Sequence, residues 1–228
     1  MSRFVIACSL IAALTSSAMA RSVAAPAHFA RPPASDVYEP DLRVAPERVL
    51  DRAAVRAKLI ANRAKNVASF RAYQKRGVFP SNTYRNGKLN VWIDAAGNMC
   101  AAATMINDWG LHDLVIRVSE QTNFIRLRDV RQGPLMDWML MSGLTQAEIV
   151  AIQEPGFMVR QQPLREPKRP TPAPILVDAD LRKAEDIRLT RRYKEVDAMI
   201  AKNAKQSIEA AVDLLMKSPE LAWKLINS

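Results

Sequence analysis

Apolar residues recur at helical spacing in two long stretches of the chain. In the first stretch they lie three, four or seven positions apart, at Val49, Ala53, Ile60, Ala64 and Val67, and Leu50 and Leu59 widen the stripe. That spacing places them on one face of a helix, with polar side chains opposite. Pro46 suits the first turn of such a helix, and Gly77 suits the position after its end. The pattern predicts a long amphipathic helix from Pro46 to Arg76.

The second stretch lies near the C-terminus and has the same period. Its apolar positions are Leu189, Tyr193, Val196, Ile200, Ala204, Ile208, Ala211 and Leu215. They predict one amphipathic helix of more than seven turns from about Asp180. We expect it to pack on the first long helix of the same chain, because Lys202 and Lys205 interrupt any regular heptad. Pro219 then begins a short final helix.

Between these stretches, a β-hairpin is the first predicted element. Asn86-Gly87 accepts the backbone geometry of a tight hairpin turn, and aromatic and β-branched residues flank it on both sides. Residues 94–97 then form a further turn.

Short helices are expected after that turn. Residues 98–109 fit either a helix or a second strand paired with residues 89–94. Three consecutive alanines and Gly110 favour the helix. Further helices are predicted to begin near Asp113, at Pro134, and at Thr145, which starts a capping box with Glu148.

These elements predict a mainly α fold: a small helical core with one short β-hairpin, flanked by two long amphipathic helices. The segments expected along the chain are a signal peptide (1–20), a leader rich in proline and alanine (21–45), the basic long helix with the α-rich core and hairpin (46–154), a proline-rich linker (155–179), and a C-terminal helical segment (180–228).

The first twenty residues have the parts of a secretory signal. Arg3 is followed by an apolar run of about 11 residues and by Ala18-Met19-Ala20, where cleavage is expected. The run is too short to cross a bilayer, which takes about 20 residues, and no later stretch predicts a transmembrane segment. We therefore expect an exported protein, periplasmic or secreted. Cys8 would leave with the signal, so Cys100 could form no disulfide within the mature chain.

Positive charge is concentrated in one segment. The formal net charge is +10 for the whole chain; residues 43–88 carry +10, whereas residues 89–154 carry −4. The cations of the first long helix that we single out are Arg48, Arg52, Arg56, Lys58, Arg63 and Lys65. This basic face either packs, solvated, against the acidic neighbouring block or binds an anionic envelope polymer or an acidic protein partner. The export signal, and the absence of aromatic residues among the cations, argue against nucleic acid.

Cys100 is the one candidate nucleophile. At a helix start it would lie in the positive end of the backbone dipole, which favours a thiolate. Such a nucleophile needs a histidine within reach, and His112 is the one candidate outside the leader. About 18 Å of helix would separate the two, so we favour a buried, structural cysteine. One cysteine and two histidines predict no metal site, and no glycine-rich phosphate loop or other cofactor motif is present.

The block between the long helices also carries a resemblance. Its ordered motifs are Asn90-Val91-Trp92, Gly97-x-x-Cys100-Ala101, Ser142-Gly143-Leu144-Thr145 and Ile152-Gln153-Glu154-Pro155. In this order the block resembles a group of uncharacterised exported bacterial proteins. The resemblance covers residues 60–155, roughly, and none of the C-terminal tail. It implies no activity.

Taken together, the sequence predicts a non-enzymatic interaction or structural protein of the cell envelope or exterior. It would contact an acidic partner or an anionic surface through the basic helix. The alternative is a thiol-dependent enzyme, peptidase-like or transglutaminase-like, that uses Cys100.

Overall fold

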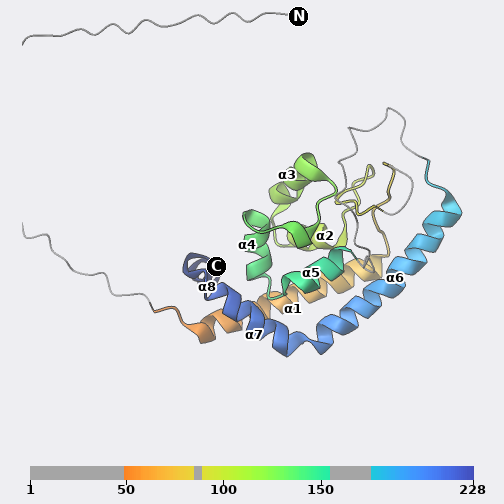
Figure 1. Ribbon diagram of the computed structural model, residues 1–228. Coiled ribbons are helices and arrows are strands. Elements are labelled where there is room, and N and C mark those ends of the chain that lie inside the picture. Colours follow the sequence, from red (N-terminus) through yellow and green to blue (C-terminus); the bar gives the residue numbers. More distant parts are fainter. Residues whose placement is uncertain (1–48, 85–88, 155–175) are drawn as a thin grey trace, which may run out of the picture. The chain divides into compact units, whose positions relative to one another are not determined.

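Helices dominate the computed structural model, which describes residues 49–84, 89–154 and 176–228. In these ranges they are α1 (Arg52–Arg76), α2 (Ala101–Asp108), α3 (His112–Thr122), the 3-10 turn η1 (Leu127–Asp129), α4 (Pro134–Met141), α5 (Gln146–Gln153), α6 (Ala179–Lys202), α7 (Ala204–Leu215) and α8 (Pro219–Ile226) (Figure 1). The prediction of a mainly α fold is confirmed. The predicted signal peptide, the leader and most of the predicted linker lie outside the described residues.

Helix α1 has a polar cap at each end. The Asp51 carboxylate accepts a hydrogen bond from the Ala53 amide at 2.7 Å, so the helix begins at Arg52 rather than at Pro46 as predicted. Gly77 ends it in the left-handed conformation at φ 65° and donates its N–H to the Tyr73 carbonyl. The predicted end at Arg76 is confirmed.

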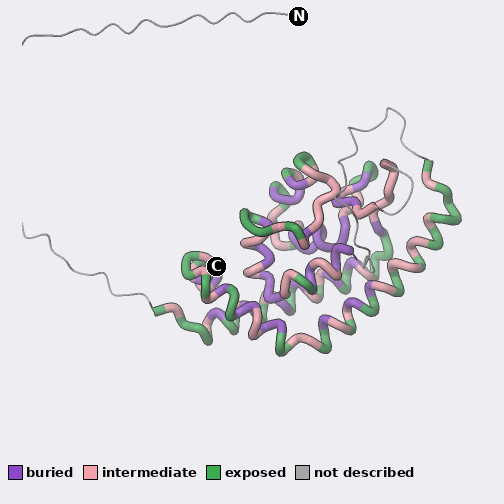
Figure 2. Tube along the Cα trace, in the orientation of Figure 1, coloured by how far each residue is buried: buried purple, intermediate pink, exposed green. Residues whose placement is uncertain are grey.

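Two apolar clusters share α1. Val55 and Leu59, in its first half, pack with residues of α7 and α8. Phe70 and Tyr73, in its second half, belong to the larger cluster with α2, α3, α5 and α6. Buried positions follow one side of the helix along its length (Figure 2). The predicted packing of the two long stretches on each other is thus observed within one chain.

Helix α2 lies deepest in the larger cluster. All residues from Ala101 to Ile106 are buried. The small alanine side chains let neighbouring helices approach closely, and α2 contacts α1, α3 and α5. Residues 101–108 are helical, so the preferred reading of this ambiguous segment is confirmed.

The predicted β-hairpin is not observed among the described residues, which contain no strand; its turn, Asn86-Gly87, lies outside them. A single antiparallel bridge joins Ile93 to Met99 around the turn at residues 94–97. The reason lies in Asn123, whose side chain accepts from the Ile93 N–H at 2.9 Å and donates to the Ile93 carbonyl at 2.7 Å. This amide takes the place of a partner strand.

The predicted single C-terminal helix is interrupted at Asn203, which separates α6 from α7. At the end of α6, the Ile200 carbonyl accepts a hydrogen bond at 2.8 Å from the guanidinium of Arg63. The side chain of α1 therefore satisfies a carbonyl next to the break. The apolar stripe continues through the break, because Ile200 and Ile208 are both buried.

The shorter helices follow their predicted signals closely. Pro134 begins α4, and Thr145 and Glu148 form the reciprocal capping box of α5. Pro219 begins α8. Asp113 does not cap α3; it lies in the first turn, where its charge still complements the helix dipole.

Candidate functional site

The predicted basic surface of α1 is largely engaged by other helices. Near its start, Arg52 lies 2.7 Å from Asp213, and Arg56 lies 2.7 Å from Glu209. Both acids belong to α7, and all four side chains are partly exposed. The hydrogen bond from Arg56 lowers the pKa of Glu209 below its ordinary value. These cations serve the α1–α7 contact.

Arg63 is buried rather than exposed. Its guanidinium forms two hydrogen bonds with the Glu148 carboxylate, at 2.9 and 2.7 Å, and also binds the Gly143 and Ile200 carbonyls. Burial alone would raise the pKa of Glu148. The hydrogen bonds from Arg63, Thr145 and Ser207, together with the positive charge of Arg63, outweigh burial and lower the pKa. This residue joins α1 to α5 and α6 and is not available to a partner.

The remaining predicted cations have different surroundings. The Lys58 ammonium donates to the Ser228 carbonyl at 2.7 Å. The Lys65 ammonium lies 5.4 Å from the centre of the Trp109 ring, within cation–π range. Arg48 lies outside the described residues. Only Glu148 of these partners comes from the acidic block; the other two carboxylates belong to α7.

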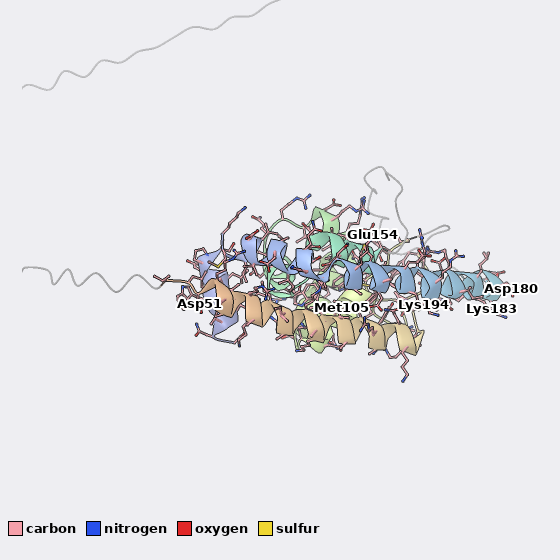
Figure 3. The ribbon with its side chains drawn as sticks, turned by 90° about the horizontal axis from the view of Figure 1, so that it is seen from below. Asp51, Met105, Glu154, Asp180, Lys183 and Lys194 are labelled. Carbon is pink, nitrogen blue, oxygen red and sulfur yellow. The ribbon has the colours of Figure 1, made fainter. Side chains whose placement is uncertain are left out.

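Three cations without an ion pair among the described residues lie together on α6. Lys183, Arg191 and Lys194 are exposed, and none forms an ion pair within the described part of the chain. With Ile187 they line a groove of about 700 Å³ that Val177 and Ser81 also border. Figure 3 labels Lys183 near the N-terminal end of α6 and Lys194 further along it. The groove therefore combines three positive charges with apolar surface.

Carboxylates nearby do not neutralise this groove. Arg182 pairs with Asp186, Arg188 with Glu185 and Arg192 with Glu195. Each of these acids is thus matched by its own arginine. Asp178 caps the start of α6 and Asp180 lies in its first turn, where negative charge complements the helix dipole. The three cations keep a net positive surface beside exposed Ile187.

Cys100 and His112 are not brought together. Cys100 caps the start of α2, and its sulfur accepts from the Ala103 amide at 3.5 Å. His112 begins α3, beyond the far end of α2, and its Nδ1 lies 2.9 Å from the Asn107 side chain. Burial raises the pKa of the Cys100 thiol to about 12, so the thiol stays protonated near neutral pH. The geometry does not form a cysteine–histidine pair.

The α6 groove is not among the sites predicted from the sequence, because the prediction for this helix used only its apolar positions. The signal that could have found it is the spacing of Lys183, Ile187, Arg191 and Lys194, which repeats at three, four and seven positions. That spacing places a second, cationic stripe beside the buried one. Five carboxylates between residues 178 and 195 concealed it in the charge count.

Other site types are not found in the described residues. They hold no group of histidine, cysteine and carboxylate side chains suited to a metal ion. Nor does any helix in ranges 49–84, 89–154 and 176–228 combine the length and apolar character needed to cross a bilayer. Comparisons of the chain with protein-family models, curated proteins and solved structures found no match.

Proposed function

We propose that this chain is a non-enzymatic interaction protein of the cell envelope or exterior, and that it binds an acidic segment of a partner protein along the α6 groove. The observation that carries the proposal is the set Lys183, Arg191 and Lys194, three exposed cations without an ion pair among the described residues. Exposed cations near an apolar side chain favour a partner that supplies carboxylates around an apolar anchor.

The groove favours α6 over α1 as the contact surface. An anion that approached Arg52 or Arg56 would compete with Asp213 and Glu209, which already lie 2.7 Å away. Lys183, Arg191 and Lys194 have no such competitor within the described residues. Binding at these three cations therefore breaks no ion pair that the described residues form.

The dimensions of the groove favour a peptide over a flat anionic surface. Lys183 and Lys194 are separated by about 16 Å along the helix axis, at 1.5 Å per residue. An extended chain covers this length with about five residues. The hollow beside Ile187 can receive a side chain of such a segment, whereas a planar surface would leave it unfilled. We therefore expect a short acidic segment with one apolar residue near its centre.

Binding of poly-L-glutamate to the purified protein tests the proposal. The variant K183Q/R191Q/K194Q removes the three groove cations. The matched control K75Q/K205Q/K217Q removes three other exposed lysines and the same total charge. We expect the groove variant to lose at least tenfold in affinity and the control to lose much less, since only the former removes the contacting charges. Affinity should also fall steeply as salt is added.

Equal losses in the two variants would show that net charge alone attracts the polymer, and would contradict a defined groove. Vesicles containing phosphatidylglycerol provide the second comparison. Tight binding to vesicles, with weak binding to poly-L-glutamate, would replace the acidic protein segment with a membrane surface as the partner. A peptide of alternating glutamate and leucine should bind more tightly than poly-L-glutamate of equal charge, because leucine can occupy the hollow beside Ile187.

A further inference from the structure

We propose that a second cavity, between the segment before α2 and the N-terminal half of α6, binds a small uncharged aliphatic molecule that carries one hydrogen-bond acceptor. The cavity measures about 330 Å³. Its lining includes Asn90, Val91, Cys100, Leu181, Leu189 and Tyr193. Among the described residues, it shares one lining residue, Arg182, with the cationic groove.

The walls of this cavity are mainly apolar. Val91, Leu181 and Leu189 supply aliphatic surface. Cys100 and Tyr193 are 2% and 3% exposed and form its buried side. Because the Cys100 pKa is raised to about 12, the thiol is an uncharged part of this wall near neutral pH. Such a surface gains free energy when an aliphatic chain covers it.

One polar side chain of the lining, Asn90, has an atom that lacks a partner among the described residues. The Asn90 side-chain nitrogen is buried and has no hydrogen bond within the described residues. A buried donor without an acceptor costs free energy, so native structures rarely keep one without a reason. The other two amides of the lining are already used. The Asn82 oxygen accepts from the Tyr84 N–H. The Gln153 oxygen accepts from the Leu127 N–H, and its nitrogen donates to the Ile125 carbonyl. Asn90 is therefore the residue that would bind the acceptor of a ligand.

Charge at the cavity favours an uncharged ligand. Arg182 pairs with Asp186, and Arg188 forms two hydrogen bonds with Glu185, both at 2.7 Å. Each arginine is thus balanced by a carboxylate, and the wall carries little net charge. An anionic ligand would lose its hydration without gaining a free cation. A ketone or an ester oxygen loses less hydration free energy than an anion does, and it can still accept a hydrogen bond from Asn90.

The volume limits the size of the ligand. At roughly 30 Å³ for each water-sized group, the cavity holds about ten or eleven non-hydrogen atoms. The ketone 2-nonanone has a fitting size and one acceptor. Nonanoate has a chain of the same length and a charged head. The pair therefore separates the contribution of the apolar cavity from that of charge.

Isothermal titration calorimetry of the purified protein with each compound tests the inference. We expect saturable 1:1 binding of 2-nonanone, and binding of nonanoate at least tenfold weaker. Leu181→Trp should block the cavity and abolish binding. The matched control is Ile187→Trp, on the same helix and comparably exposed, at 63% against 71%. The Ile187→Trp variant should bind 2-nonanone with the affinity of the wild type, because Ile187 does not line the cavity.

Asn90→Leu removes the unpartnered donor and keeps the branched shape of the side chain. We expect about a tenfold loss of affinity for 2-nonanone without any loss of melting temperature, since the donor has no partner among the described residues. No saturable binding of 2-nonanone, equal binding of nonanoate, or an unchanged affinity in Leu181→Trp would each overturn the inference. Binding of poly-L-glutamate is not needed for any of these results, so this inference and the proposed function can fail independently.

Discussion

At the scale of single residues, Arg63 and Glu148 hold three parts of the chain in register. The Glu148 carboxylate also accepts from the Thr145 N–H at 2.9 Å and from the Ser207 hydroxyl at 2.9 Å. Both charges are buried, and both have several hydrogen-bond partners. Removal of one partner from such a pair leaves a buried charge and typically costs about 3–5 kcal/mol. This pair specifies how α1, α5 and α7 meet.

The lowered pKa of Glu148 predicts a loss of stability in acid. Its folded pKa lies below the ordinary value of 4.5, so the folded state favours the ionised form. The stabilisation is complete well above pH 4.5 and is lost as the pH falls through the folded pKa. Denaturant unfolding between pH 7 and pH 3 should show this decline. Glu148→Gln should be less stable than the wild type at pH 7, and its free energy of unfolding should fall less between pH 7 and pH 3. An equal fall in the variant and the wild type would show that Glu148 does not cause the loss of stability in acid.

Cys100 gives a prediction about reactivity. Its thiol is 2% exposed and its pKa is raised to about 12, so little thiolate forms at pH 7. We expect slow alkylation by iodoacetamide in the native protein and fast alkylation after denaturation. Cys100→Ser should cost about 1–3 kcal/mol, because a hydroxyl is harder to bury than a thiol. Fast native labelling at pH 6 would restore the thiol-enzyme alternative.

The sequence predicted the burial of Cys100 but not that of Arg63. A lone cysteine before three alanines was correctly expected to be buried. Arg63 was grouped with exposed cations, because it lies in a run of basic residues every four to seven positions. Its burial depends on Glu148, 85 residues later, and on the Gly143 carbonyl. Contacts so distant in the chain leave no local pattern.

At the scale of elements, periodicity and capping predicted most of the helices. Pro134, Thr145 and Pro219 each begin the helix expected of them. Two of the errors, the hairpin and the uninterrupted C-terminal helix, share a feature: a side chain from elsewhere bonds backbone groups that the local pattern assigned to regular structure. Asn123 bonds both backbone groups of Ile93, and Arg63 bonds the Ile200 carbonyl beside the break after α6.

The packing of α1 against the turn after α4 predicts a severe effect of one methyl group. Gly143 has φ 75°, and a Cβ there would overlap the Leu59 carbonyl oxygen and lie 2.9 Å from the Arg63 Cβ. Gly143→Ala should therefore force α1 away and cost more than about 3 kcal/mol. The control is Gly110→Ala, where φ is 82° but no atom lies within 4 Å. Strain alone should cost about 1–2 kcal/mol there. Equal losses in urea unfolding would contradict the close approach.

At the scale of the whole molecule, charge along the chain does not map directly onto the surface. The segment of highest positive charge contains α1, yet three of its arginines lie against acids of α6 and α7: Arg52, Arg56 and Arg71, the last at 3.0 Å from Asp197. The predicted acidic neighbour block supplies Glu148 alone of these partners. Three exposed cations without an ion pair among the described residues, Lys183, Arg191 and Lys194, lie instead on α6, outside this segment. A charge count along the chain can suggest the class of partner, but it does not locate the binding surface.

The sharing of α1 by both apolar clusters predicts that they unfold together. Trp92 and Trp138 are buried in the larger cluster, and Trp223 belongs to α8 beside the smaller one. Since α1 supplies buried residues to both, neither cluster keeps its packing once this helix is lost. Two variants test this, one that retains only Trp138 and one that retains only Trp223, with phenylalanine at the other tryptophan positions. In each variant, the urea midpoint measured by tryptophan fluorescence should equal the midpoint measured by circular dichroism. A fluorescence transition of Trp223 that precedes the loss of helical signal would show that α7 and α8 detach separately from α1.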